Sequence, residues 1–352
     1  MSAISGRVGS GMRSSYAGLQ VTVFGARGRM GRYVAHDLGR VGTALMLPHH
    51  GCELEMRDHK VMGDYGQIGI VPFHGRDRDS IRAAVEGSDV VINCIGKHYQ
   101  TRHAVPGVIN WTFDQVNGEL AGDIASVCAE AGVGRLVHVG AAAADHDSDS
   151  AWARSKAKGE DAVRAAFPDA TIIKPTIVSA PEDAFLTLYA RMTKVLPFVP
   201  LIDFGDATYA PVNVADVAKA IVEVAMEDKD YNPATGEDEY RSVGQDYELA
   251  GPSEYTQKEI VEFVFDTIKV NGQAVPVPQK LLELQAMGVG MLPNPMVNED
   301  QVKLWALDHT IDGSLPGFEA LGITPQNLED YGKQFLLRFK PGGHFVEEAG
   351  YH

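Results

Sequence analysis

The chain has 352 residues, enough for one large domain and a smaller one, and its 45% hydrophobic and 22% charged residues are ordinary for a globular protein. No apolar run approaches the ~20 residues of a membrane-spanning helix. The net charge of -16 argues against general binding to nucleic acid, which attracts excess Lys and Arg. Cys52, Cys94 and Cys128 have no metal-ligand spacing, so we expect free thiols in a reducing compartment and no metal site.

The opening of the chain is rich in Ser and Gly. It contains Arg7 and Arg13, and the first acidic residue is Asp37. This composition is typical of a mitochondrial targeting segment and equally of a flexible arm. We expect residues 1–18 to form an N-terminal arm.

The next part of the chain alternates predicted strands with predicted helices. This pattern indicates a parallel sheet covered by helices on both faces. The predicted fold class is therefore α/β, with a Rossmann-type doubly wound parallel sheet in a nucleotide-binding domain at residues 19–176. The predicted strands are Gln20–Phe24, Thr43–Leu47, Ile68–Phe73, Val90–Ile95, Arg135–Val139 and Ala170–Lys174, and the clearest helices are Asp79–Glu86, Val116–Ala131 and Ala151–Ala166.

After Pro175 the segments become longer and less regular, with several prolines between them. Helices resume at Val214–Glu227 and Gln257–Asp266. We expect residues 177–340 to form a smaller C-terminal lobe, from which some segments, including Val212–Asp216, return to the first domain. Residues 341–352 are predicted to be an extended C-terminal arm.

A glycine motif of the form GxxGxxG lies directly between the first strand and the helix that follows it. Gly25 permits a tight turn, Gly28 lets the backbone approach a pyrophosphate, and Gly31 lets the helix pack close to the sheet. The start of the helix offers free N–H groups to an anion. The motif predicts a dinucleotide site, although packing alone would also explain the glycines. The candidate residues are Gly25, Ala26, Arg27, Gly28, Arg29, Met30 and Gly31.

The end of the second strand bears on which dinucleotide binds. NAD-binding folds usually place an acid there for the ribose 2′-OH, but this chain has none between Leu47 and Glu53. A 2′-phosphate would then meet no repulsion, and Arg27 would donate to it as a fork. The sequence favours NADP(H) over NAD(H), with His50 as a further phosphate contact. Solvated surface positions are the alternative for Arg27, Arg29 and His50.

Three further segments complete the candidate site. Cys94, Ile95 and Gly96 end the fourth strand, where a small apolar backbone would pass the adenosine half of the nucleotide. We interpret Cys94 as a small hydrophobic residue, not a reactive thiol. The remaining candidates are Val139 and Gly140 at the fifth strand, and Pro175 after the sixth.

The catalytic half of the site is incomplete. Dehydrogenases of the short-chain kind use a Tyr as acid/base, a Lys four residues later, and a Ser after the fifth strand. Here Trp152 precedes Lys156 at that spacing, and Ala141 lies where the Ser is expected. We therefore expect no catalytic residue, with Lys156 either holding a ribose or lying on a helix surface. Nearby Ser148, Ser150, Ser155, His98 and Tyr99 lack the required helical spacing to Lys156.

Motifs along nearly the whole chain resemble one family, the atypical, extended short-chain dehydrogenase/reductases that serve as an accessory subunit, alpha-subcomplex subunit nine, of mitochondrial respiratory complex I. Three residues depart from the family pattern: His74 replaces an acid that reads adenine, Trp152 replaces a Tyr, and His50 replaces an Arg. The motifs include VTVFGARGRMGRYV (21–34), MGDYGQI (62–68), RDRDSIR (76–82), VVINCIG (90–96), KGEDAVRAAFPDATIIKP (158–175), PVNVADVAKAIV (211–222), AGPSEYT (250–256) and LPGFEALGI (315–323).

The resemblance implies a non-catalytic subunit with a tightly bound NADPH of structural role. It also implies a peripheral position on the matrix side of the mitochondrial inner membrane, where the quinone module meets the membrane arm. Its partners would be other complex I subunits, with membrane lipid as a further candidate and no nucleic acid. The alternative is a free-standing NADP-dependent reductase or epimerase, against which the missing Tyr and Ser argue. The sequence has no feature for or against a third interpretation, a regulatory redox sensor.

Overall fold

The structure of the chain is a computed structural model that describes residues 17–102, 109–183, 185–232, 237–289 and 297–341. The arms expected at residues 1–18 and 341–352 lie almost wholly outside these ranges. None of the helices within them combines the length and the apolar character that crossing a bilayer requires.

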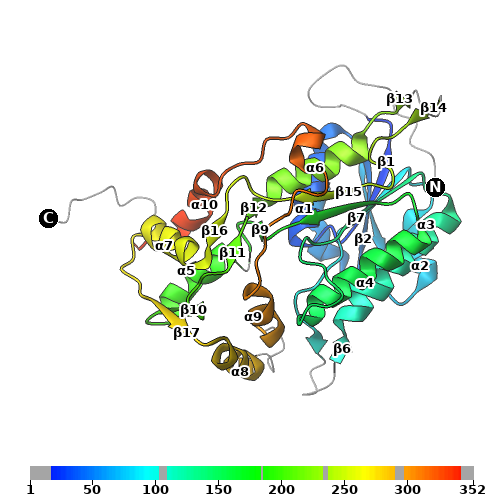
Figure 1. The fold of residues 1–352 in the computed structure, drawn as a ribbon. Coiled ribbons are helices and arrows are strands. Elements are labelled where there is room, and N and C mark those ends of the chain that lie inside the picture. The colour runs from blue at the N-terminus through cyan, green and yellow to red at the C-terminus, as the bar shows by residue number, and fades with distance from the viewer. Residues whose placement is uncertain (1–16, 103–108, 184, 233–236, 290–296, 342–352) are drawn as a thin grey trace.

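A seven-stranded parallel sheet is the largest sheet of the described structure (Figure 1). Its strand order is β3-β2-β1-β4-β7-β8-β15, which confirms the predicted doubly wound α/β fold. The predicted number of six strands was wrong, because β15 joins the sheet from much later in the chain. The strands are β1 (Gln20–Phe24), β2 (Ala44–His49), β3 (Ile68–Pro72), β4 (Val90–Asn93), β7 (Arg135–Val139), β8 (Thr171–Pro175) and β15 (Asp246–Leu249).

Charged side chains attach the seventh strand to its neighbours. Asp246, the first residue of β15, pairs with Ile172 of β8 in parallel register. Its carboxylate lies 2.9 Å from Nζ of Lys174 in β8 and also forms an ion pair with Arg164. These half-buried pairs explain why a short strand with an acidic residue extends an otherwise apolar sheet.

Helices cover both faces of the sheet (Figure 1). Val21 and Val23 of β1 pack in the cluster that includes α1 and α6, whereas Phe24 packs against the opposite helices, because side chains alternate along a strand. The first face is covered by α1 (Arg29–Val41) and α6 (Val214–Met226), and the second by α2 (Arg78–Val85), α3 (Leu120–Ala131) and α4 (Ala151–Ala166). A π-helical segment (Asp114–Glu119) leads directly into α3, so the predicted helix Val116–Ala131 is continuous but not α-helical throughout.

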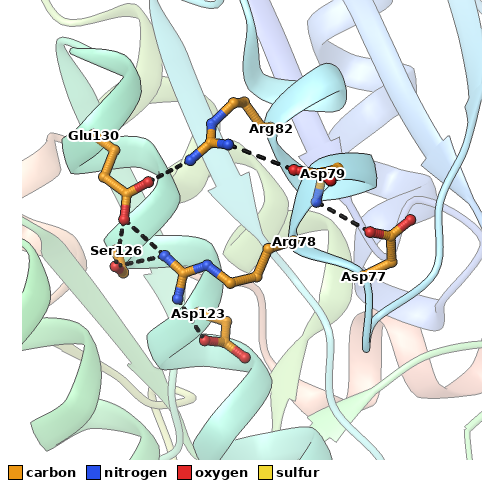
Figure 2. A network of polar contacts seen from close by, with 7 residues as sticks. All are labelled: Asp77, Arg78, Asp79, Arg82, Asp123, Ser126 and Glu130. Carbon is orange, nitrogen blue, oxygen red and sulfur yellow. Dashed lines mark hydrogen bonds and ion pairs between the residues drawn. The ribbon is translucent and has the colours of Figure 1, made fainter.

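An ion-pair network joins α2 to α3 on the protein surface (Figure 2). The carboxylate of Glu130 in α3 accepts hydrogen bonds from the guanidinium groups of Arg78, at 2.7 Å, and Arg82, at 2.6 Å. Arg78 also reaches Asp123, 3.2 Å away, and Asp77 caps the start of α2. Because these side chains are about half exposed, we interpret the network as one that aligns α2 with α3 and not as a ligand site.

The later part of the chain builds a second set of apolar clusters. One cluster packs α5, α7 and α10 together, and another packs α8 and α9 against Ile202. The helices are α5 (Leu186–Val195), α7 (Gln257–Ile268), α8 (Gln279–Val289), α9 (Glu299–Trp305) and α10 (Leu328–Leu336), with 3-10 helices at Glu53–Val61, Phe318–Leu321 and Leu337–Phe339. The short strands are β5 (Thr101–Arg102), β6 (Ile109–Trp111), β9 (Val178–Ser179), β10 (Val199–Ile202), β11 (Thr208–Tyr209), β12 (Val212–Asn213), β13 (Asp230–Asn232), β14 (Glu237–Glu239), β16 (Tyr255–Thr256) and β17 (Ala274–Val277).

Candidate nucleotide-binding site

The predicted site residues lie at the carboxyl ends of the parallel strands, where ligands bind in open α/β sheets. The glycine loop follows β1, and the segment from Cys94 to Gly96 follows β4, the neighbouring strand. Val139 ends β7 and Pro175 ends β8. The sheet therefore brings together residues that are far apart in the sequence.

Two positions of the loop require glycine because of the backbone conformation and close packing of the protein. Gly25 has φ +76°, and a Cβ there would lie 3.0 Å from the backbone of Cys94. A Cβ on Gly31 would collide with the carbonyl oxygen of Gly25. These positions therefore fix the turn and its approach to β4 whether or not a ligand binds.

Gly28 differs from the other two glycines. Its φ of -64° and ψ of 167° are open to any residue. A Cβ there would meet only the carbonyl oxygen of Gly25 within 4 Å, at 3.0 Å. The loop is exposed at Arg27, Gly28 and Arg29, and Gly28 is the N-cap of α1, so we expect a side chain on Gly28 to lie close to the start of that helix.

The start of α1 is suited to an anion. Gly28 is the N-cap, none of the described side chains caps the helix, and its first turn contains no acid. The first N–H groups of a helix carry partial positive charge and need an acceptor. A pyrophosphate at this position would supply one, so the residues present fit the predicted group.

Lys156 is held inside the protein, which excludes the helix-surface alternative. Its side chain is 5% exposed, and Nζ donates to the carbonyl oxygen of Val139 at 3.0 Å. Burial lowers the pKa of Lys156, and the carboxylate of Glu160 opposes that effect. A Cβ on Gly96 would lie 3.3 Å from Nζ, so Lys156 faces the segment after β4.

Cys94 packs against the core cluster of the first face, and the backbone of Gly140 is bound to β8. Burial raises the pKa of the Cys94 thiol to about 12, so the thiol is protonated at neutral pH. The N–H of Gly140 donates to the carbonyl oxygen of Ile173 at 2.8 Å. A Cβ on Gly140 would collide with the carboxylate of Glu160.

His50 is exposed and lies in a row of rings at the ends of β2 and β3. The centroid of its ring is 5.2 Å from that of the His74 ring, and the centroids of the His74 and Trp111 rings are 6.5 Å apart. The guanidinium of Arg76 lies 4.1 Å from the centre of the Trp111 ring. The sequence identified His50 and His74 but not Trp111 and Arg76, which approach from other elements.

The charge environment of Arg27 differs from the expectation. The sequence places no acid at the end of β2, but the following 3-10 helix (Glu53–Val61) brings Glu55 into an ion pair with Arg27. Both side chains are substantially exposed, at 56% for Arg27 and 43% for Glu55. Arg27 is therefore held by an intramolecular partner before any phosphate reaches it.

The position of the expected proton donor is filled by apolar packing. The side chain of Trp152 is 8% exposed and packs with Phe113, Ala141 and Leu304. The ring of His98 stacks on it, with centroids 5.2 Å apart and an angle of 22° between the planes. The indole Nε1 has no hydrogen-bond partner among the described residues. Leu304 comes from α9, so a late segment of the chain packs against Trp152.

The nearby serine hydroxyls are engaged in internal contacts. Ser155 donates to the carbonyl oxygen of Trp152 at 2.7 Å and accepts from the amide of Asn117 at 3.0 Å. Ser150 caps α4 and donates to Asp300 at 2.9 Å. Ser148 accepts from the N–H of Ser150 at 3.2 Å. Their contacts assign these groups to holding α4 in place.

Asp300 of α9 accepts hydrogen bonds from the start of α4, the helix that carries Trp152 and Lys156. Besides Ser150, its carboxylate accepts from the N–H groups of Ala151 at 2.6 Å and Trp152 at 3.0 Å. The sequence did not predict this contact. The capping box of α9, which joins Asn298 and Gln301, indicates where that helix starts but not what it touches.

We expect Asp300→Ala to lower the free energy of unfolding by about 2–3 kcal/mol, because it removes charge-assisted bonds from two N–H groups at a helix start. Chemical denaturation with a tryptophan fluorescence readout measures the change. Glu299→Ala is the matched control, since that carboxylate contacts Lys303 on its own helix. Equal effects of the two substitutions would contradict the role of Asp300 in holding the start of α4.

Comparison with known proteins places the chain in a class. Residues 25–228 match the NAD(P)H-binding family. Among solved structures, an NADPH-dependent quinone oxidoreductase from Escherichia coli has a TM-score of 0.65 at 16% identity, covering 89% of this chain and 99% of that one. A triphenylmethane reductase from Citrobacter has the same TM-score at 15% identity, covering 90% of this chain and 100% of that one. Together with the glycine loop, these findings define an NAD(P)H-binding protein with a Rossmann-type fold.

More similar sequences define the particular family. The chain is 35% identical over 347 residues to the mitochondrial NADH dehydrogenase (ubiquinone) 1 alpha subcomplex subunit 9 of Arabidopsis thaliana, covering 96% of this chain and 82% of that protein. The mouse protein of the same name is 37% identical over 336 residues, covering 94% and 83%. The mitochondrial NADH-ubiquinone oxidoreductase 40 kDa subunit of Neurospora crassa is 32% identical, covering 95% and 83%. The chain belongs to this family of NADH dehydrogenase alpha subcomplex subunits.

Proposed function

We propose that the chain is a non-catalytic, NADPH-binding accessory subunit of mitochondrial respiratory complex I. The observation that carries the proposal is the apolar packing of Trp152 where the fold's enzymes need a proton donor. Membership of a family whose relatives are named as subunits of NADH dehydrogenase supports it. A bound nucleotide would then stabilise the fold, with no substrate to reduce.

Each part of the predicted site has a role in binding. The glycine loop and the start of α1 would hold the pyrophosphate, and Arg27 and His50 would lie on the side of the 2′-phosphate. Lys156 would donate to the nicotinamide ribose. When bound, NADPH supplies a reduced nicotinamide. The adenosine side is assigned to Cys94, Ile95 and Gly96, and the nicotinamide side to Val139, Gly140 and Pro175.

We propose a peripheral position on the matrix side of the mitochondrial inner membrane, near the junction of the quinone module and the membrane arm. The word mitochondrial in the relatives' names supports the compartment. Native electrophoresis of membranes dissolved in mild detergent tests the assignment. The chain is expected to migrate with complex I, and exclusive migration as a free protein would contradict the proposal.

We expect the protein to bind NADPH roughly tenfold more tightly than NADH, because charge-assisted bonds from Arg27 to the 2′-phosphate have no equivalent in NADH. Calorimetric titration with each nucleotide measures the ratio. Arg27→Ala should weaken NADPH binding selectively. Equal or reversed affinities of the unmodified protein would refute the preference for the phosphorylated nucleotide.

A further inference from the structure

The 3-10 helix after β2 is anchored beneath the glycine loop. Met56 is fully buried in the core cluster that includes α1. His59, 1% exposed, places Nε2 3.0 Å from the carbonyl oxygen of Ala26 and donates to it. Met56 directly follows Glu55 in the sequence, and His59 joins the helix to Ala26, the residue before Arg27. The location of Glu55 on this helix is therefore set by packing.

The carboxylate of Glu55 lies between two nitrogen-bearing side chains. Its Oε2 forms the ion pair with Nη1 of Arg27 and lies 3.7 Å from Nε2 of His49, the last residue of β2. Burial and the charge of Arg27 lower the pKa of His49, and the carboxylate of Glu55 opposes that effect. The cluster thus contains the guanidinium of Arg27, the carboxylate of Glu55 and the imidazole of His49.

This cluster lies where dinucleotide-binding folds distinguish a 2′-hydroxyl from a 2′-phosphate, at the end of the second strand. Building on the proposed function, we propose that Glu55 is a specificity-determining residue. It supplies from the following helix the carboxylate that β2 itself lacks, and it competes with a 2′-phosphate for Arg27.

The ion pair then affects the binding free energies of NADPH and NADH differently. A 2′-phosphate must draw Arg27 away from Glu55 and lie near that carboxylate, so like-charge repulsion reduces its advantage. A 2′-hydroxyl leaves the ion pair intact and can donate to Glu55. Because the pair is exposed, it is weak enough for a doubly charged phosphate to displace. Glu55 therefore sets how strongly the protein prefers NADPH without deciding whether it binds a dinucleotide.

The test is a competition experiment on the full-length protein. Protein incubated with an excess of an equimolar NADPH and NADH mixture is passed through a desalting column, and the retained nucleotides are extracted and quantified. Glu55→Gln is expected to raise the retained NADPH to NADH ratio roughly three- to tenfold, because it removes one charge from an exposed cluster. Glu53→Gln is the matched control, since Glu53 pairs with Lys60 at 2.5 Å on the same helix and should leave the ratio unchanged.

A ratio in Glu55→Gln that stays within twofold of the unmodified protein, or that falls, would overturn the role of Glu55 and leave the proposed function standing. An equal rise in the Glu53→Gln control would also overturn it, because the effect would then come from general surface charge. Retention of neither nucleotide by the unmodified protein would overturn the proposed function, and the role of Glu55 with it. Thermal unfolding of both variants confirms that the folded proteins are compared.

Discussion

Replacing Gly28 with valine is expected to weaken nucleotide binding by roughly a hundredfold or more, equivalent to about 3 kcal/mol of lost backbone contacts to the pyrophosphate. The backbone angles of Gly28 suit valine, but its Cβ would lie 3.0 Å from the carbonyl oxygen of Gly25, which must shift slightly, so thermal unfolding must first show that the variant is folded. Because Gly28 is the N-cap of α1, we expect the branched side chain to obstruct the approach of an anion to the first N–H groups of that helix. Calorimetric titration with NADPH measures the loss.

A matched control separates this effect from general damage. Gly288 in α8 is exposed and a Cβ there meets nothing within 4 Å, so Gly288→Val should bind NADPH as the unmodified protein does. Gly31→Val is unsuitable as a control, because it collides with Gly25 and disturbs the loop itself. Binding retained in folded Gly28→Val would remove the glycine loop from the proposed site.

The second large effect is the absence of hydride transfer. We expect no NADPH oxidation above background with quinone or carbonyl acceptors, because a positioned acid/base typically contributes ~10²–10⁴-fold to the rate. Trp152→Tyr should remain inactive, since Ala141 supplies no hydroxyl to orient a carbonyl and Leu304 packs against the same surface. Absorbance at the nicotinamide band follows the reaction in both proteins.

The control for this experiment is a measurement of nucleotide retention. Trp152→Tyr must still bind NADPH, so that inactivity reflects missing chemistry and not an empty site. Steady oxidation of NADPH by the unmodified protein would support the reductase or epimerase alternative. Activity gained by Trp152→Tyr alone would mean that another group orients the acceptor.

Much of the fold was predictable because its strands are apolar runs. β1 and β7 were predicted with their observed bounds, and the other four predicted strands differ at their ends by one or two residues. β15 was missed because two of its four residues are acids, and the strand joins the sheet through contacts of Asp246 with Lys174 and Arg164. Such pairing depends on contacts between distant segments, which local patterns do not encode.

The candidate site was predictable where backbone geometry requires particular residues. Gly25 and Gly31 are explained by a positive φ and a close approach, and the buried Lys156 lies at helical spacing from Trp152. Glu55 and Asp300 were missed because each approaches from an element with no local sign of its target. A 3-10 helix has no long hydrophobic period, and a cap supplied by a distant helix has no sequence spacing at all.

We expect the bound nucleotide to stabilise the folded protein and to take no part in turnover. A ligand bound only to the folded state stabilises it by RT ln(1 + [L]/Kd), about 2.7 kcal/mol at a concentration 100 times Kd. Loss of binding in Gly28→Val should therefore reduce the amount of assembled complex I in cells that express only this variant. The most direct measurement is NADH:quinone electron transfer divided by the amount of assembled complex in those cells. We expect the same activity per assembled complex as in unmodified cells, whereas a fully assembled complex without electron transfer would contradict a structural role of the nucleotide.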